Sequence, residues 1–161
     1  EAAARGIDAD RLVFAPYAPT IQDHLGRLQL ADIALDTAPY NSHSTGVDAL
    51  WCGVPLVCLR GQRFAGRVAA SLVAAAGVPE LAVDTLEDYH RLALALATDA
   101  DALRAMKSRL EDARSRAPLF DTAGFARDLE ALYLRIRESH RAGSTAIGDR
   151  RRRRRTGSAC R

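Results

Sequence analysis

The chain has 161 residues, 48% of them hydrophobic, which suits one buried core and therefore one domain or one lobe of a larger protein. Its formal net charge is +3, but residues 1–140 hold 15 basic and 19 acidic residues, so the positive excess belongs to residues 141–161. A mildly acidic body argues against a nucleic-acid-binding domain, and charges interrupt the long apolar stretches, so no transmembrane helix is predicted.

Apolar periodicity predicts strands that alternate with helices over the first 85 residues, and helices after that. In chain order the predicted elements are strand 12–15, helix 20–30, strand 33–35, helix 48–52, strand 56–59, helix 64–76, strand 81–83 and helices 86–97, 100–116 and 121–140. Continuous apolar strands joined by helical crossovers imply a parallel sheet covered on both faces. The fold class is therefore α/β, a Rossmann-like lobe followed by C-terminal helices.

The two ends of the chain differ from its middle. Residues 143–161 contain glycine, serine, threonine and the six consecutive arginines of 150–155, a composition that cannot form a core. We expect a folded lobe over residues 1–142 and a disordered, solvated Arg-rich tail after it. The chain starts at Glu1 within a helix-like segment, which suggests a fragment of a longer protein.

Three cysteines, Cys52, Cys58 and Cys160, are too few and too unevenly placed for a disulfide framework, and no Cys/His spacing suggests a zinc site. Cys52 and Cys58 are expected to be small buried hydrophobic residues. With no signal peptide visible, the sequence favours a reducing, cytoplasmic location.

The segment 41–48 lies between a predicted strand and a predicted helix, and it is the most informative part of the chain. Free backbone N–H groups and the positive end of the helix dipole suit such a turn to phosphate. The side chains of His43, Ser44 and Thr45 can add hydrogen-bond donors, and Asp48 can accept from sugar hydroxyls. The pattern indicates a nucleotide-sugar site.

Two further points bear on this turn. In parallel sheets, ligands bind beyond the carboxyl ends of the strands, so the loop 15–19 and the turn 41–48 are expected to face one cleft. The plainer interpretation is a helix N-cap, because Thr45 and Asp48 also have the spacing of a capping box.

A series of short blocks between about Arg11 and Arg137 occurs in an order that one known family shares. They are Phe14-Ala15-Pro16, Ala18-Pro19, His24, Arg27, Gln29 to Asp32, Leu35-Asp36-Thr37, the turn from Asn41 to Asp48, Leu50-Trp51-x-Gly53-x-Pro55, Arg67 to Ser71 and Pro118 to Asp121. With these residues the chain resembles the C-terminal lobe of the O-linked N-acetylglucosamine transferases, glycosyltransferase family 41, of bacterial type.

The resemblance implies a GT-B fold whose C-terminal lobe binds UDP-N-acetylglucosamine. The sugar is transferred, with inversion, to Ser or Thr hydroxyls of acceptor proteins, and neither a metal nor a cofactor is required. The implied positions are Ala18 beside the uracil, His24 and Arg27 against the nucleoside, His43, Ser44 and Thr45 at the pyrophosphate, and Asp48 on the ribose.

Some of the family's parts have no counterpart here. The family's catalytic lysine lies upstream of the matched region, and Lys107 sits too late in the chain to replace it. The family often has a lysine shortly before the His24 position, where residues 20–23 have none. We therefore expect no catalytic residue in this chain, and a missing N-terminal lobe, with possible tetratricopeptide repeats, as its partner.

Alternatives remain open at the sequence level. A related protein glucosyltransferase would use UDP-glucose, and a non-catalytic UDP-binding module would lack transfer altogether. Taken alone, His24 and Arg27 are typical of solvated helix residues. Helical spacing predicts several core residues. They are Trp51, then Leu103, Met106 and Leu110 of one helix, and Leu129, Leu132 and Ile136 of the last helix, with Tyr133 beside them.

Overall fold

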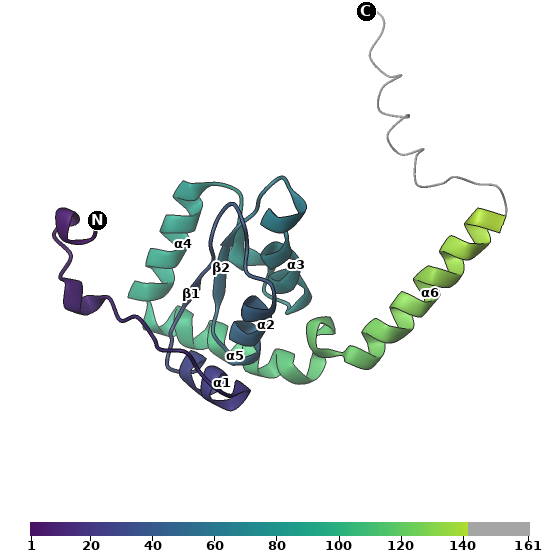
Figure 1. Ribbon diagram of the computed structural model, residues 1–161, viewed down its shortest axis with the longest axis horizontal. Coiled ribbons are helices and arrows are strands. Elements are labelled where there is room, and N and C mark those ends of the chain that lie inside the picture. Colours follow the sequence, from purple (N-terminus) through teal and green to yellow (C-terminus); the bar gives the residue numbers. More distant parts are fainter. Residues whose placement is uncertain (142–161) are drawn as a thin grey trace, which may run out of the picture. The chain divides into compact units, whose positions relative to one another are not determined.

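The computed structural model describes residues 1–141, which divide into one compact unit over Glu1–Arg114 and a second that begins at Ser115 (Figure 1). The helices are α1 (Ile21–Leu28), α2 (Ser44–Trp51), α3 (Val68–Ala75), α4 (Leu86–Thr98), α5 (Ala100–Arg116) and α6 (Thr122–Arg141), and the strands are β1 (Ala34–Leu35), β2 (Leu56–Leu59) and β3 (Ala82–Val83). The expected tail, 143–161, and the end of the expected lobe at residue 142 lie outside the described residues.

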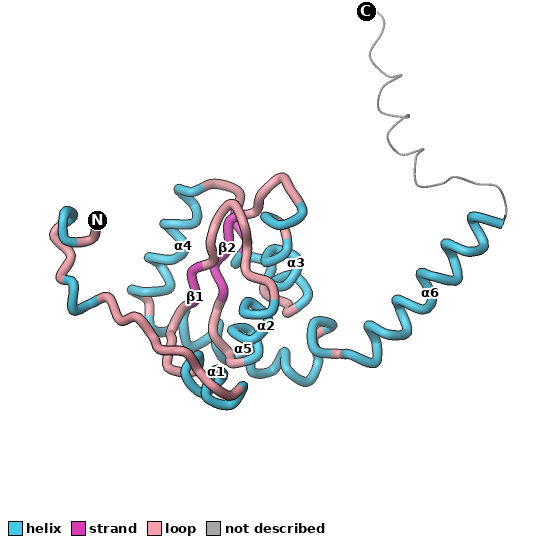
Figure 2. Tube along the Cα trace, viewed as in Figure 1, coloured by secondary structure: helices cyan, strands magenta, loops and turns pink. Residues whose placement is uncertain are grey.

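The three strands form a parallel sheet in the order β1-β2-β3. Ala34 pairs with Leu56 across the first ladder, and Cys58 pairs with Ala82 across the second. The sheet lies between α4 on one face and α2 and α3 on the other (Figure 2). This arrangement confirms the predicted α/β class with a parallel sheet covered on both faces.

The core of the first unit gathers around the central strand, since Val57 and Cys58 of β2 have no exposed surface. Helices contribute the largest neighbours, of which Leu50 on α2, Val73 on α3 and Leu110 on α5 are also fully buried. The fully buried Leu110 and the almost fully buried Met106 confirm the core face predicted for α5. Burial of this apolar surface is the main stabilising term of the lobe.

Side chains at the helix starts explain where three helices begin. The hydroxyl oxygen of Thr20 accepts from the Asp23 N–H at 3.1 Å, and that of Thr85 accepts from the Asp88 N–H at 3.0 Å. Asp99, directly before α5, accepts from two backbone N–H groups of its first turn. These bonds satisfy donors that have no partner inside the helix.

The predicted strand 12–15 is wrong. The segment belongs to no strand among the described residues, and Val13 and Phe14 are 87% and 91% exposed. An isolated extended segment gains no ladder hydrogen bonds, and the nearby Pro16 and Pro19 have no N–H to donate. Apolar composition alone therefore does not distinguish an exposed connecting segment from a buried strand.

Two predicted helices have different bounds in the structure. The helix expected at 48–52 starts earlier, as α2. The helix expected at 64–76 is divided into a 3₁₀ turn, Phe64–Gly66, and α3. At this division the Gly61 N–H donates to the Gly66 carbonyl at 2.6 Å, and a Cβ added at either glycine would meet backbone atoms of its surroundings at 3.0 Å or less.

Several residues expected in the core are exposed. Trp51 is 44% exposed, and its carbonyl accepts from the guanidinium of Arg114, which also lies over the indole ring. On α6, Leu132, Tyr133 and Ile136 are 43%, 62% and 45% exposed. Spacing correctly predicted the helix but not what covers its apolar face. Of the helices within residues 1–141, none combines the length and apolar character needed to cross a membrane.

Candidate functional site

The turn after β1 leads directly into α2, and His43 is the residue at its start. The carbonyl of His43 accepts from the N–H groups of Gly46 and Val47 at 3.1 and 3.2 Å, but no side chain among the described residues caps the helix. The alternative capping box of Thr45 and Asp48 is therefore wrong. An uncapped helix start leaves N–H donors and the positive dipole end available to an anion.

Asp48 pairs instead with a residue of α1. Its Oδ2 lies 3.2 Å from Nε2 of His24, and the two side chains are only 28% and 24% exposed. A guanidinium nitrogen of Arg27 lies 3.4 Å from the other ring nitrogen of His24, and a second donates to the carbonyl of Pro16 at 2.5 Å. Three of the predicted residues thus form one connected row, and neither His24 nor Arg27 is a freely solvated side chain.

The ring of His43 is fixed by two aromatic neighbours. Tyr40 stacks on it with ring centroids 5.2 Å apart and planes 10° apart, and Phe64 meets it edge-on at 6.3 Å. The Nε2 atom of His43 is buried and has no hydrogen-bond partner among the described residues. A held imidazole with a spare nitrogen is suited to bond a ligand oxygen.

A cavity of about 560 Å³ opens beside this turn. It is lined by Leu28, Ala34 to Thr37, Tyr40 to His43, Thr45, Ala49 and Leu56. The structure therefore brings His43 and Thr45 to the cavity, whereas Ser44 and the row of His24, Arg27 and Asp48 lie outside its lining. Ala18 is half-buried in the loop before α1 and is not part of the lining within the described chain.

The two buried polar residues of the cavity lining were not among the predicted site residues. Asp36 follows β1 and is 9% exposed, and Asn41, in the turn, is 1% exposed. Asp36 accepts from the Ser42 N–H at 2.7 Å, and the Asn41 amide donates to the Thr37 carbonyl at 3.1 Å. A carboxylate directly after a predicted strand was the available signal, because strand ends in parallel sheets border ligand sites.

The negative charge of Asp36 affects the groups around it. Burial, and secondarily this charge, raises the pKa of the Cys58 thiol to about 12, with Arg60 opposing the change. Burial, the Asp36 charge and Cys58 likewise raise the pKa of the Tyr89 hydroxyl, which donates to the Asp36 carbonyl at 2.9 Å. Cys58 is thus an unreactive buried thiol, as expected, while Cys52 is only partly buried.

Acidic and metal-binding side chains do not cluster at the turn. Within residues 1–141 no three His, Cys, Asp or Glu side chains stand where they could hold one metal ion. The donors at the turn are backbone N–H groups, hydroxyls and the positive end of the α2 dipole.

Comparison with known proteins gives concordant results. The family described as Glycosyl transferase family 41 matches residues 1–129. A UDP-N-acetylglucosamine--peptide N-acetylglucosaminyltransferase of Caenorhabditis elegans is 40% identical over 139 residues, which are 86% of this chain and 12% of that protein. The probable UDP-N-acetylglucosamine--peptide N-acetylglucosaminyltransferase SEC of Arabidopsis thaliana is 38% identical over 88% of this chain and 14% of its own length.

A solved structure shows the same likeness. A mutant of the Thermobaculum terrenum O-GlcNAc transferase superposes with a TM-score of 0.80 at 34% identity, over 88% of this chain and 27% of that one. The predicted Rossmann-like lobe fold and the predicted resemblance are both confirmed. This chain spans only about an eighth of the length of the two relatives named above.

Proposed function

The chain belongs to glycosyl transferase family 41, and from this membership we propose that it is the donor-binding lobe of a protein O-GlcNAc transferase. The enzyme would move N-acetylglucosamine from UDP to Ser or Thr hydroxyls of proteins. The relatives' names specify this donor and a peptide acceptor, which favours UDP-N-acetylglucosamine over UDP-glucose and favours transfer over binding alone.

One observation in the structure carries the proposal. The α2 helix starts at His43 without a side-chain cap among the described residues, and His43 keeps a buried nitrogen unbonded. The unbonded nitrogen is costly in a protein that binds nothing there, because buried polar groups are normally paired. A diphosphate would satisfy them, with Ser44 and Thr45 adding hydroxyl and backbone donors.

The nucleoside would lie on the row formed with α1. Asp48 would accept from ribose hydroxyls, and His24 and Arg27 would line the nucleoside, with Ala18 beside the uracil. The existing contact between Asp48 and His24 holds both side chains before a ligand arrives. Such preorganisation reduces the entropy that binding must otherwise lose.

In the reaction, the acceptor oxygen forms a bond to the anomeric carbon on the face opposite the phosphate. The bond from that carbon to the β-phosphate oxygen breaks, UDP leaves with the electron pair, and the proton of the acceptor hydroxyl is released to water or to a base of the second lobe. This lobe would stabilise the growing negative charge on the phosphate through fixed donors, an electrostatic contribution. We assign no catalytic residue to this chain. Its Lys107, on α5, donates to the carboxylate of Asp32 at 2.8 Å.

The remaining parts of the function follow the family. The protein would need neither a metal nor a cofactor, and it would act in the cytoplasm on acceptor proteins. A second lobe would supply the acceptor side of the cleft, and tetratricopeptide repeats are a further expected partner.

Isothermal calorimetry tests the donor site with UDP, uridine and either EDTA or Mg²⁺ in the buffer. We expect UDP to bind more tightly than uridine, with equal affinity in both buffers. Asp36 is the one carboxylate that lines the cavity within the described residues, and Mg²⁺ needs more oxygen ligands than one side chain supplies. Loss of binding with EDTA would overturn the metal-free claim. Failure of UDP to exceed uridine would overturn the diphosphate site itself.

A further inference from the structure

Asp36 is held in place from three sides. Its N–H donates to the Val57 carbonyl of β2 at 3.0 Å, and its carbonyl accepts from the Tyr89 hydroxyl of α4 at 2.9 Å. Its carboxylate Oδ1 accepts from the Ser42 N–H at 2.7 Å, one residue before His43. The side chain therefore connects the rigid end of the sheet to the turn that opens α2.

The second carboxylate oxygen of Asp36 makes no hydrogen bond within the described residues. Oδ2 of Asp36 is buried and has no hydrogen-bond partner among the described residues, and the same holds for Oγ of Ser42 and Nε2 of His43. All three residues line the cavity of about 560 Å³. A buried carboxylate is destabilising unless its oxygens are bonded, so stability alone does not account for an aspartate here.

The bond to Ser42 also determines which backbone donors remain for a ligand. Asp36 occupies the Ser42 N–H, and the His43 carbonyl occupies those of Gly46 and Val47. The N–H groups of Ser44 and Thr45 lie between these occupied positions, in the first turn of α2. A shift of the Ser42 backbone would move His43 and both of these donors together.

We propose that Asp36 is the positioning residue of the diphosphate-binding turn, acting through its hydrogen bond to the Ser42 N–H rather than through its charge. This inference rests on the proposed function, because it assumes that the turn binds the UDP diphosphate. Misplacement by about 1 Å at such a site is enough to reduce binding and rate severely. A negative charge beside a diphosphate would by itself weaken binding. The contribution of Asp36 is therefore to hold the Ser42 backbone in position.

Two substitutions separate position from charge. Asp36→Asn keeps an acceptor oxygen at the same distance from the backbone and removes the charge. Asp36→Glu keeps the charge and moves the acceptor by one methylene. Asp36→Ala removes the acceptor without lengthening the side chain. It is a second variant that breaks the bond to Ser42, and it replaces Asp36→Glu if that variant does not fold.

The quantity to measure is the ratio of UDP affinity to uridine affinity, by calorimetry below the melting temperature of every variant. We expect Asp36→Asn to keep the parent ratio within about threefold, and Asp36→Glu and Asp36→Ala to lower it by about tenfold or more while uridine affinity stays unchanged. Tyr89→Phe is the matched control, because it removes a different hydrogen bond to Asp36 and leaves the Ser42 bond intact. It should lower the melting temperature and leave the ratio unchanged.

Each other outcome overturns the inference. A ratio that falls in Asp36→Asn and survives in Asp36→Glu would assign the role to charge. Equal loss of UDP and uridine affinity, or no loss in any variant, would show a merely structural residue. If the parent chain binds UDP no better than uridine, the proposed function fails before any variant is compared, so the two failures are distinguishable.

Discussion

The side chain of Asp48 could act within its own helix, as a cap, or in a contact with another helix. Its position near the start of α2 is consistent with helix capping, yet its carboxylate lies 3.2 Å from His24 of α1 and caps nothing. The carboxylate therefore acts between two helices rather than within one. This geometry makes the ribose role and the capping role experimentally separable.

We expect Asp48→Ala to reduce UDP affinity by about 1.5–3 kcal/mol, because a partly buried carboxylate that accepts from ribose hydroxyls is lost. The melting temperature should change little, since no helix cap is removed. Calorimetry and thermal unfolding on one preparation measure both. Asp32→Ala is the control, because it removes an exposed carboxylate that pairs with Lys107. A lower melting temperature with unchanged affinity per folded molecule would contradict the ribose role.

At the residue scale, sequence reasoning found side chains that follow a local pattern and missed those that depend on tertiary contacts. His43 and Thr45 were found because a strand-to-helix turn has a recognisable composition. Asp36 and Asn41 were missed, since their burial depends on packing between loops that are distant in sequence, as in the bond from the Asn41 N–H to the Ala65 carbonyl. Periodicity contains no information about such contacts.

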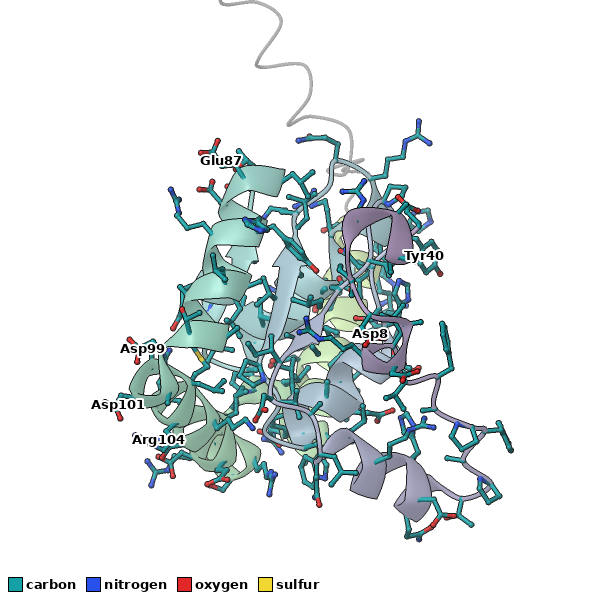
Figure 3. All side chains as sticks on the ribbon, turned by 90° about the vertical axis from the view of Figure 1, so that its left-hand side faces the viewer. Asp8, Tyr40, Glu87, Asp99, Asp101 and Arg104 are labelled. Atoms are coloured by element: carbon teal, nitrogen blue, oxygen red, sulfur yellow. The ribbon has the colours of Figure 1, made fainter. Side chains whose placement is uncertain are left out.

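Helix boundaries depend on single capping residues, and α5 offers a direct test. Asp99 accepts from the N–H groups of Asp101 and Ala102, both at 3.0 Å. Figure 3 shows Asp99, Asp101 and Arg104 grouped on the molecular surface where α5 begins. The carboxylate of Asp101 is 88% exposed and pairs with Arg104.

Asp99→Ala should lower the free energy of unfolding by about 1 kcal/mol, because two N–H groups lose their acceptor. Asp101→Ala, two residues away, should stay within about 0.5 kcal/mol of the parent, since exposed ion pairs contribute little. Chemical denaturation of both variants gives the comparison. Equal effects would mean that charge near the helix start, rather than the cap, is what stabilises α5.

The buried Cys58 of the central strand should make the stability of the fold depend on pH in the alkaline range. Burial and the nearby Asp36 charge raise the pKa of Cys58 to about 12 from its ordinary value of 9.0. Above pH 9 the unfolded chain loses this thiol proton while the folded chain keeps it, so the free energy of unfolding must fall as pH rises from 9 toward 12. The contribution is fully present below pH 9.

Cys58→Ala removes this titrating group. Its stability at neutral pH should be lower by about 1 kcal/mol because the core loses a buried sulfur. Above pH 9 the parent should lose this advantage and become the less stable of the two before pH 11, because the linkage amounts to about 1.4 kcal/mol per pH unit. Denaturation curves recorded from pH 7 to 11 measure the difference. Parallel pH profiles for the two proteins would show that the Cys58 pKa is not raised.

At the scale of elements, the sequence predicted the type of each helix better than its limits. The α2 helix began four residues before its expected start, because Ser44, Thr45 and Gly46 are typical of turns yet join the helix once Leu50 packs in the core. Tertiary packing here overrides weak local propensities. For α6, the apolar spacing correctly predicted a helix. The sequence does not indicate what should cover its apolar face, and so the exposure of that face was not predicted.

At the scale of the whole molecule, the parallel sheet brings the loops that follow its strands to one edge. The sequence predicted a parallel sheet with the turn 41–48 after one of its strands, because buried parallel strands and their crossovers have a strong pattern. It also placed the loop 15–19 at that edge, and this was wrong in its basis because residues 12–15 form no strand among the described residues. It could not predict the exposure of residues 12–15, since only a neighbouring strand decides whether an extended segment becomes part of a sheet. A donor site can be built by such an edge alone, but transfer requires a second reactant held against it.

We therefore expect the 161-residue chain to bind UDP and to transfer no sugar. Transfer requires an acceptor hydroxyl aligned with the anomeric carbon, and in well-oriented systems such positioning contributes about 7–11 kcal/mol. The catalytic lysine that the resemblance implies would lie upstream of the matched region, and the chain's one lysine, Lys107 on α5, pairs with Asp32 at 2.8 Å. Labelled UDP-N-acetylglucosamine and an acceptor peptide should give no product above background.

The control for this experiment is UDP binding by the same preparation, which shows that inactivity does not come from misfolding. Covalently joining the upstream lobe of a family member to this chain should restore transfer, and His43→Ala in the joined protein should lower it again, because the donor turn is then needed. Turnover by the chain alone would mean that catalytic groups lie among its own residues, with the cavity beside Asp36 and His43 as the first place to search for them.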